Sequence, residues 1–211
     1  MIEAVIFDND GVLVDSEPLH HLAETQTLAQ FNIDFTEEDF KKYVGIGWHK
    51  MLSDWIVTYN LPTTTEKLRE IHERNLINAF EKYVEQTPNV EKFIIALKNK
   101  NYKLGVASSS SRVLVETGLR KTRLLHYFDL VVCSDNVKNT KPDPEIYLLT
   151  ADRLGISPEK CFVIEDSSTG VKAAKAAGMQ CGGYQNPNSG NQDLSRADVI
   201  FKDFFELQNL L

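Results

Sequence analysis

Short, continuously apolar runs recur along most of the chain, and stretches with helical periodicity lie between them. The apolar runs are Ala4–Phe7, Leu104–Ala107, Leu130–Cys133, Cys161–Ile164, Met179–Tyr184 and Val199–Phe201. Because these runs do not alternate with polar residues, they predict strands that are covered on both faces. Apolar residues at steps of three and four predict the intervening helices Val90–Asn99, Arg112–Lys121, Glu145–Leu154 and Ser168–Ala177. This alternation predicts an α/β fold with a doubly wound parallel sheet.

Residues 16–86 interrupt the alternation of strands and helices. No convincing strand occurs there, and the periodicity predicts helices over Glu17–Phe31, Glu37–Val44, His49–Tyr59 and Thr65–Tyr83. A segment of this length is too long for a loop between a strand and a helix. We therefore predict an inserted all-helical cap subdomain over residues 16–86, with residues 1–15 and 87–211 forming the α/β core.

The composition, 42% hydrophobic and 25% charged residues in a chain of 211, is that of an ordinary soluble globular protein. The formal net charge is −7, and residues 16–85 carry most of the excess, with 12 acidic and 7 basic side chains. An acidic balance argues against a general binder of nucleic acid or of a membrane surface, since both require a basic face. It does not exclude a small anionic substrate.

Two further features of the chain concern its compartment. No apolar run approaches the roughly 20 residues that span a bilayer, and Met1–Phe7 lacks the basic region of a signal peptide. The three cysteines, Cys133, Cys161 and Cys181, lie far apart in apolar runs, which is typical of reduced, buried thiols. We expect a cytoplasmic protein, and we expect it to be a monomer.

Two carboxylates follow the first predicted strand, at Asp8 and Asp10. In an open α/β sheet, ligands bind beyond the carboxyl ends of the strands. Two acidic side chains at this position can converge on one divalent cation, and hard oxygen ligands suit Mg²⁺. The alternative is a simple turn, since Asn9-Asp10-Gly11 is also strong turn chemistry.

A second acidic pair, Glu165 and Asp166, follows the fourth predicted strand. The alternative there is helix capping, by Asp166 or by Ser167. Parallel strands place both acidic pairs at the same edge of the sheet. Several carboxylates gathered at one edge repel one another unless a cation or a proton intervenes. Together the two pairs therefore favour a metal site.

Two further segments are suited to binding an anion. Ser108–Ser111 joins the second strand to a helix, and hydroxyls with free amides at a helix N-terminus can bind phosphate. The alternative is a serine-rich loop that supplies only the helix N-cap. Lys141 precedes Pro142 and Pro144, which fix the backbone before the next helix, and it could neutralise phosphate charge. The alternative is a solvated surface lysine.

The order of these segments resembles the four motifs of the haloacid dehalogenase-like hydrolases, in particular the β-phosphoglucomutase-like phosphatase subgroup with a helical cap. The matching segments are Asp8-x-Asp10-Gly11-Val12, Ser108, Lys141-Pro142-Asp143-Pro144 and Glu165-Asp166-Ser167-x-x-Gly170-Val171. Asp15-Ser16-Glu17-Pro18-Leu19-His20 matches the usual start of the cap. The resemblance covers nearly the whole chain. One departure is Asn9, at a position where the family more usually has a hydrophobic residue, Cys or Met.

The resemblance implies a Rossmann-like core and a role for each of these side chains. Asp8 would be the nucleophile that forms an aspartyl-phosphate, and Asp10 would be the general acid and later the general base. Mg²⁺ would be held by Asp8, the backbone carbonyl of Asp10 and Asp166, with Glu165 nearby or bound through water. The residues implied to hold the phosphoryl oxygens are Ser108 and Lys141, with Ser109 as a backbone donor.

The resemblance also implies substrate-binding residues in the cap. His20 matches a position close to the active site in the mutase of the subgroup, although it is also suited to a helix surface or an interdomain contact. The segment Val44–Lys50 resembles the substrate-specificity loop, where Gly45 would allow a close approach to the substrate. Trp48 could stack on a sugar ring or simply pack between cap and core.

The same loop bears on the reaction. The mutase grips the second phosphate of a bisphosphate with a Lys before the loop glycine and an Arg three residues after it. Here those positions are Val44 and Trp48, and the basic residues His49 and Lys50 are displaced. Loss of a cationic contact would weaken the grip on a bisphosphate, which favours hydrolysis over mutase chemistry.

The sequence therefore predicts a Mg²⁺-dependent phosphatase that hydrolyses a small phosphorylated metabolite, with sugar phosphates as candidates. The alternative enzyme is a β-phosphoglucomutase-like sugar phosphomutase. An alternative of another class is a non-catalytic binding or regulatory protein on the same scaffold. The intact set Asp8, Asp10, Lys141 and Asp166 argues against it, since without catalysis a costly acidic cluster would have no purpose.

Overall fold

The computed structural model describes residues 1–43, 48–208 and 210–211, with His49 described only as part of its helix. The chain forms two compact units: residues Met1–Ser16 with Val84–Leu211, here called the sheet unit, and Glu17–Tyr83, here called the helical unit. This division places Ser16 and residues 84–86 with the sheet unit, whereas the sequence analysis assigns them to the cap. The difference is small, and a short antiparallel bridge between Val14 and Gln86 accounts for part of it.

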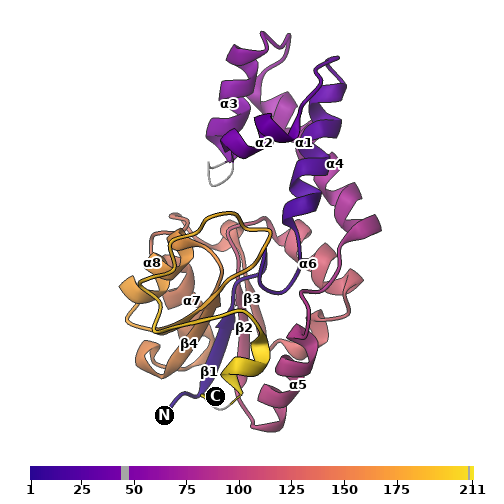
Figure 1. Cartoon of the computed structure of the whole chain (residues 1–211). Coiled ribbons are helices and arrows are strands. Elements are labelled where there is room, and N and C mark those ends of the chain that lie inside the picture. Colours follow the sequence, from indigo (N-terminus) through magenta and orange to yellow (C-terminus); the bar gives the residue numbers. More distant parts are fainter. Residues whose placement is uncertain (44–47, 209) are drawn as a thin grey trace. The chain divides into compact units, whose positions relative to one another are not determined.

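The described residues of the sheet unit form a six-stranded parallel sheet in the order β3-β2-β1-β4-β5-β6. Figure 1 labels the four strands β1 to β4. The strands are β1 (Ala4–Phe7), β2 (Lys103–Ala107), β3 (Leu130–Val132), β4 (Cys161–Glu165), β5 (Gln180–Tyr184) and β6 (Val199–Phe201). β1 lies in the middle, and its last residue, Phe7, is opposite Val106 of β2 and Ile164 of β4. The expected doubly wound α/β fold is confirmed.

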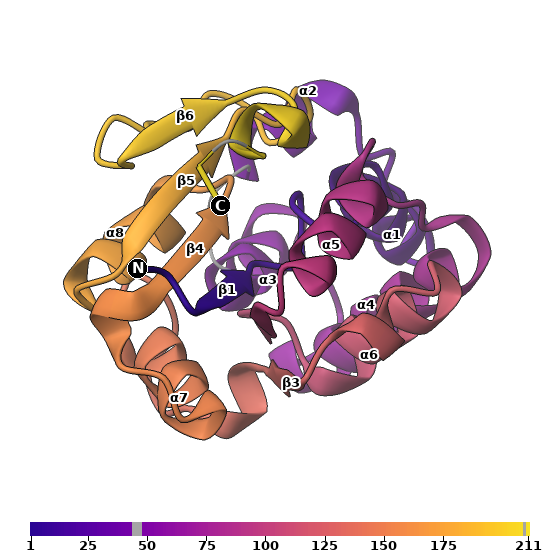
Figure 2. The ribbon, with the colours of Figure 1, turned by 90° about the horizontal axis from the view of Figure 1, so that it is seen from below.

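Helices cover both faces of this sheet. They are α5 (Val90–Asn99), α6 (Arg112–Lys121), α7 (Glu145–Leu154) and α8 (Ser168–Ala176), with short 3₁₀ helices η1 (Leu125–Tyr127), η2 (Ser134–Asn136), η3 (Pro158–Lys160) and η4 (Phe204–Leu207). Figure 2 shows α7 and α8 on one face and α5 and α6 on the other. Ile6 belongs to the apolar core beneath α7 and α8, and its neighbour Phe7 meets Phe93 of α5 edge to face, with ring centroids 6.3 Å apart. Both faces of β1 are therefore buried, which explains its continuous apolar run.

The helical unit contains α1 (Glu17–Ala29), α2 (Glu37–Tyr43), α3 (Trp48–Thr58) and α4 (Thr65–Tyr83). Its apolar core gathers around the fully buried Trp55. α1 ends two residues earlier than predicted, because Asn32 has a left-handed φ of +60° and the amide of Ile33 returns to the carbonyl of Leu28. Such a turn closes the helix before the apolar pattern of the sequence ends.

Polar groups are also buried inside the helical unit. The side-chain amide of Asn75 donates to the hydroxyl of Thr27 over 3.1 Å, and Nδ1 of His72 lies 3.4 Å from the same oxygen. Burial and the neighbouring His20 lower the pKa of His72 to about 4. This histidine therefore packs as a neutral ring between α1 and α4.

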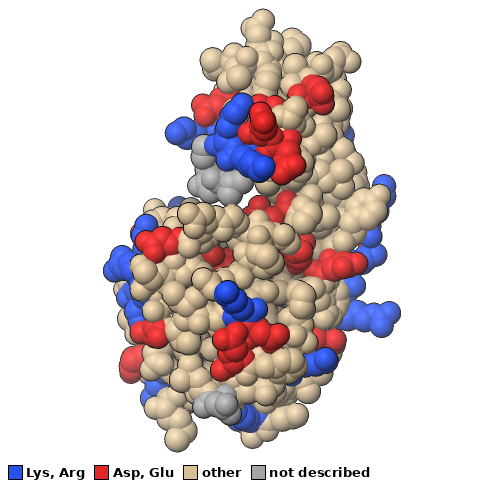
Figure 3. Space-filling view, viewed as in Figure 1, with Lys and Arg blue, Asp and Glu red and all other residues tan. Residues whose placement is uncertain are grey.

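The cysteines and the surface charges bear on two expectations from the sequence. All three cysteines are buried and unbridged, as predicted. On the face shown in Figure 3, acidic and basic side chains of the described residues are interspersed and form no continuous basic patch. None of the helices that the structure describes combines the length and the apolar character that crossing a bilayer requires.

Candidate active site

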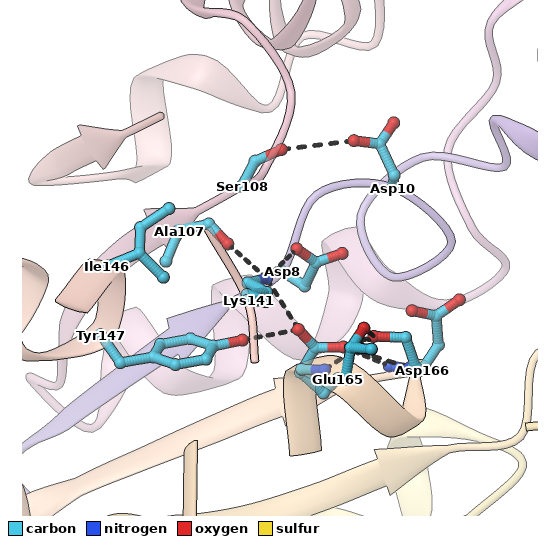
Figure 4. Close-up of polar contacts among 12 residues, drawn as sticks. Asp8, Asp10, Ala107, Ser108, Lys141, Ile146, Tyr147, Glu165 and Asp166 are labelled. Carbon is cyan, nitrogen blue, oxygen red and sulfur yellow. Dashed lines mark hydrogen bonds and ion pairs between the residues drawn. The ribbon is translucent and has the colours of Figure 1, made fainter. Parts of the chain in front are cut away.

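The sheet brings the predicted chemistry to one edge. Asp8 follows β1, Ser108 follows β2, and Glu165 and Asp166 come at the end of β4. Because β1 pairs in parallel with both β2 and β4, these residues emerge side by side. The amide of Asp8 continues the ladder by donating to the carbonyl of Ile164 over 2.9 Å. Figure 4 shows the resulting group of side chains.

Lys141 lies at the centre of this group. Its Nζ lies 2.5 Å from Oδ1 of Asp8, 2.7 Å from Oε1 of Glu165 and 2.9 Å from the carbonyl oxygen of Ala107. All three N–H groups of the ammonium therefore have acceptors in this arrangement. The side chain is only 5% exposed, which rules out the alternative of a solvated surface lysine. Lys141 holds the nucleophile candidate and the second acidic pair together.

Glu165 is surrounded by donors on both carboxylate oxygens. Oε1 accepts from the hydroxyl of Tyr147 over 2.6 Å as well as from Lys141. Oε2 accepts from the amides of Asp166 and Ser167, each over 3.1 Å, and from the Ser167 hydroxyl over 2.9 Å. Position 170 must be glycine, since a Cβ there would overlap this carboxylate. These contacts favour Glu165 as a support for its neighbours over a direct metal ligand.

The capping alternative at this acidic pair holds for one residue. Ser167 is the N-cap of α8, and its hydroxyl accepts from the amide of Gly170 over 3.0 Å. Asp166 does not cap the helix; its Oδ2 accepts a hydrogen bond from the hydroxyl of Ser189. Capping and the acidic cluster therefore coexist on neighbouring residues.

Asp8, Glu165 and Asp166 form a buried cluster whose nearest carboxylate oxygens lie within 4.8 Å of one another. Three carboxylates face one ammonium group there, so the cluster carries excess negative charge. In Figure 4 the carboxylates of Asp8 and Asp166 are turned to the side away from Tyr147. Oxygen donors that are buried, close together and under-neutralised fit a hard divalent cation such as Mg²⁺. The carboxylate of Asp10 is not part of this cluster, so only its backbone carbonyl could contribute a ligand of the kind expected.

The pKa values of the cluster follow from burial and charge. Burial raises the pKa of Asp8 to about 8, and the nearby Glu165 and Asp10 add to the effect, whereas Lys141 opposes it. Burial would also raise the pKa of Glu165, but Lys141 and the hydrogen bonds from Tyr147 and Ser167 lower it below its ordinary value. The two carboxylates in turn raise the pKa of Lys141 against its burial. Burial therefore makes Asp8 harder to ionise, and Lys141 acts against this effect.

Asp10 lies with the serines that follow β2. Oδ2 of Asp10 accepts from the hydroxyl of Ser110 over 2.8 Å and from that of Ser108 over 3.3 Å. Ser108 is fully buried, while Ser109 is exposed. Ser111 occupies the N-cap position of α6 without a side-chain capping bond. The hydroxyls of Ser108 and Ser110 therefore contact Asp10, and the serine-rich segment is not simply a side-chain cap of α6.

Of the expected cap residues, His20 and Trp48 belong to the described part of the helical unit. The ring of His20 is half-buried and meets Phe80 edge to face, with centroids 6.3 Å apart. Trp48 is 40% exposed, and the guanidinium of Arg69 lies 6.0 Å from the centroid of its ring. Gly45, like the rest of residues 44–47, lies outside the described residues.

Three side chains of the site are not predicted from the sequence: Tyr147, Ser110 and Ser189. Tyr147 fits the apolar periodicity of α7 and looks like an ordinary core residue, although its hydroxyl reaches Glu165. Ser110 belongs to the predicted serine run but was not distinguished within it. Nothing in the turn-rich sequence around Ser189 signals its contact with Asp166.

The family model for haloacid dehalogenase-like hydrolases matches residues 5–184, which is most of the chain. The chain belongs to the haloacid dehalogenase-like hydrolases. Among curated relatives, it is 35% identical to the phosphorylated carbohydrates phosphatase of Thermotoga maritima, over 100% of this chain and 98% of that protein. It is 30% identical to the β-phosphoglucomutase of Bacillus subtilis, over 98% of this chain and 92% of that protein.

Solved structures agree with this assignment. The CbbY protein of Rhodobacter sphaeroides in complex with phosphate superimposes with a TM-score of 0.86 at 26% identity, covering 98% of this chain and 96% of that one. The resemblance on which the sequence analysis rested is thus confirmed, as is the prediction of an enzyme of the phosphatase type. The acidic cluster of this haloacid dehalogenase-like hydrolase, Asp8, Glu165 and Asp166, lies at the carboxyl ends of β1 and β4.

Proposed function

We propose that this haloacid dehalogenase-like hydrolase is a Mg²⁺-dependent phosphatase that hydrolyses a small phosphorylated carbohydrate through an aspartyl-phosphate on Asp8. The observation that carries the proposal is the position of Asp8, which directly follows the central strand β1 and lies between the ammonium of Lys141 and the carboxylate of Asp166. The relatives named as a phosphorylated carbohydrates phosphatase and a β-phosphoglucomutase support the substrate class.

In the first step, a carboxylate oxygen of Asp8 attacks phosphorus and the bond from phosphorus to the leaving oxygen breaks. Asp10 donates a proton to that leaving oxygen. In the second step, Asp10 takes a proton from water as the water oxygen attacks phosphorus, and the Asp8 carboxylate is released. Lys141 helps to keep Asp8 ionised for the first step, since its charge opposes the effect of burial.

The residues that would hold Mg²⁺ are Asp8, Asp166 and the backbone carbonyl of Asp10. Glu165 would support them through its contacts with Lys141 and with the amide of Asp166. When bound, Mg²⁺ would offset the repulsion between the Asp8 carboxylate and the incoming phosphate. Because burial raises the pKa of Asp8, a cation at this site competes with a proton, and we expect the affinity for Mg²⁺ to rise with pH.

The phosphoryl oxygens would be held by the Ser108 hydroxyl and the backbone amide of Ser109, with positive charge from Lys141. Since each N–H group of Lys141 already has an acceptor, its contact with phosphate would require exchange of one of these partners. We assign substrate selection to the helical unit as a cap, with His20, Gly45 and Trp48 as its candidate contacts. Positioning and charge stabilisation would supply most of the rate enhancement.

The test is an assay of phosphate release from p-nitrophenyl phosphate and from a panel of sugar phosphates. Mg²⁺ should be required, EDTA should stop turnover, and added Mg²⁺ should restore it. Asp8→Asn should abolish turnover while leaving the fold intact. Wild-type-like turnover by Asp8→Asn would exclude the nucleophile, and activity that is insensitive to EDTA would exclude the metal.

A sugar phosphomutase is the second candidate, supported by the relative named β-phosphoglucomutase. Val44 and Trp48 stand where the mutase has its Lys and Arg, which weighs against it. Incubation with β-glucose 1-phosphate and a bisphosphate primer separates the two reactions. Phosphate release faster than isomerisation supports the phosphatase, and the reverse order supports the mutase.

A further inference from the structure

The carboxylate of Asp10 is held through only one of its two oxygens. The hydroxyls of Ser110 and Ser108 both point to Oδ2, over 2.8 Å and 3.3 Å respectively. The other oxygen, Oδ1, is buried and has no hydrogen-bond partner among the described residues. Oδ2 therefore already accepts hydrogen bonds, whereas Oδ1 is free to carry or accept a proton.

The closer donor, Ser110, is held firmly by its own backbone. Its amide donates to the hydroxyl oxygen of Ser108 over 3.0 Å, which leaves the hydrogen of that hydroxyl free to be donated to Asp10. Its carbonyl accepts from both the amide and the hydroxyl of Ser134 in η2, over 3.2 Å and 3.1 Å. The Ser110 hydroxyl therefore projects from a fixed point of the chain.

Arg112, two residues after Ser110, also makes hydrogen bonds to β3 and η2. The amide of Arg112 donates to Asp135 over 2.7 Å, and its guanidinium donates to the carbonyl of Val131 and the side chain of Asn136, each over 3.0 Å. On the other side of Ser110, the amide of Ser108 donates to the carbonyl of Val132. The loop is thus attached to β3 and η2 on both sides of Ser110, as expected of a support for a functional side chain.

We infer that Ser110 is a positioning residue for the reaction: its hydroxyl holds Oδ2 of Asp10 so that Oδ1 is the oxygen that transfers the proton. The inference rests on the proposed function, in which Asp10 is the general acid. An oxygen that accepts from the Ser110 hydroxyl is best left unprotonated, because a proton on it would compete with that donor. This holds also when the Ser108 hydroxyl turns from Asp10 to the phosphoryl group. Oδ1 has no such competition.

Both proton transfers of the reaction then take place at Oδ1 of Asp10. When the bond from phosphorus to the leaving oxygen breaks, the electron pair stays on that oxygen, which takes the proton from Oδ1. When water attacks the phosphoryl group on Asp8, Oδ1 takes a proton from the water and the bond from phosphorus to Asp8 breaks. Asp10 returns to its starting state, with Ser110 bound to Oδ2 throughout.

The inference is tested by comparing two esters of similar shape with Ser110→Ala and Ser110→Thr. Nitrophenolate leaves readily without a proton, whereas phenolate is a stronger base and depends more on the general acid. The specificity constant kcat/KM reports only the steps up to departure of the alcohol. In Ser110→Ala we expect kcat/KM to fall about tenfold for phenyl phosphate and less than about threefold for p-nitrophenyl phosphate. Ser110→Thr, which keeps the hydroxyl, should restore the wild-type ratio of the two esters.

Two further variants complete the test. Ser111→Ala removes a neighbouring hydroxyl that makes no side-chain capping bond. This variant should leave kcat/KM unchanged for both esters. Asp10→Asn should lose more activity on phenyl phosphate than on p-nitrophenyl phosphate; if it does not, the proposed general acid is wrong. A different outcome is that Asp10→Asn behaves as expected while Ser110→Ala lowers kcat/KM for both esters equally, or for neither. In that case the positioning role of Ser110 is overturned and the proposed function stands.

Discussion

Gly11 and Asp166 approach so closely that only a residue without a side chain fits at position 11. A Cβ atom on Gly11 would overlap Oδ2 and Cγ of Asp166. Gly11 also has a φ of +77°, in the left-handed region that residues with a side chain rarely adopt. The glycine of the first motif therefore turns the chain and also admits the carboxylate of the acidic cluster.

Gly11→Ala should abolish most of the activity, because the new methyl group must displace Asp166 or the loop that carries Asp10. A shift of about 1 Å in such a site costs on the order of 100-fold in rate. We expect at least this loss in kcat/KM for p-nitrophenyl phosphate, together with a higher Mg²⁺ requirement. The measurement is steady-state kinetics over a range of Mg²⁺ concentrations.

Gly178→Ala is the matched control for this variant. Gly178 has nearly the same backbone conformation, with a φ of +76°, but a Cβ there would meet nothing within 4 Å. Both variants should lose about 1–2 kcal/mol of stability through backbone strain. Only Gly11→Ala should lose activity, and comparable activity losses in the two would show that strain rather than contact with Asp166 is responsible.

Ser189 fixes the metal-binding candidate Asp166 by donating a hydrogen bond to its Oδ2. Ser189→Ala should weaken Mg²⁺ binding about 10-fold or more, since groups that orient a ligand usually contribute this much to affinity. Calorimetry with Mg²⁺ measures the affinity directly, without turnover. Asn188→Ala removes a contact of the same loop with Asp15 and should leave the affinity unchanged; an equal loss in both variants would point to disruption of the loop.

The strands of the sheet could be predicted because burial on both faces leaves a simple mark on the sequence. The end of β4 shows the limit of that rule. The apolar pattern stops at Ile164, but the strand continues through Glu165, which pairs with Gly183 of β5. A charged residue can end a buried strand here because Lys141 and Tyr147 satisfy its carboxylate, and both come from distant parts of the chain.

The acidic pairs, Ser108 and Lys141 could be found from the sequence because each follows a strand or precedes a helix in a set order. Their supports could not. Tyr147 obeys the same helical periodicity as a core residue, and only the packing of α7 against β1 reveals that its hydroxyl meets Glu165. Ser189 reaches Asp166 across 23 residues of chain, by a path that no local propensity determines.

Asn9 is the one departure from the family pattern in the first motif, and the structure shows its cost. Its side chain is fully buried, and neither its amide nitrogen nor its amide oxygen has a hydrogen-bond partner among the described residues. Asn9→Leu keeps the branched skeleton and removes the unsatisfied groups. We expect a gain of about 1–3 kcal/mol in the free energy of unfolding, measured by urea denaturation. Asn9→Ala should gain less, because it leaves a cavity; a destabilised Asn9→Leu would mean that the amide is satisfied in solution.

Glu24 makes the stability of the helical unit depend on pH. Its carboxylate is buried in α1, with Oε2 lacking a partner among the described residues. Burial, with a smaller effect of Glu17, raises its pKa to about 8. The unfolded chain ionises near the ordinary value of 4.5, so the folded state holds the proton more tightly between these limits. The contribution of Glu24 to the stability of the helical unit should therefore be fully present below about pH 4.5 and decline as the pH rises toward 8.

Glu24→Gln should remove this decline, because the amide keeps the shape of the protonated acid and does not titrate. Both tryptophans, Trp48 and Trp55, belong to the helical unit, so their fluorescence during urea unfolding reports on that unit. His72 acts in the opposite direction below pH 6.5, so the comparison is made between pH 6.5 and 8. Over that range the wild type should lose about 1 kcal/mol per pH unit relative to Glu24→Gln. The exposed substitution Glu70→Gln should follow the wild type, and parallel curves for Glu24→Gln and wild type would show that Glu24 is already ionised in the folded protein.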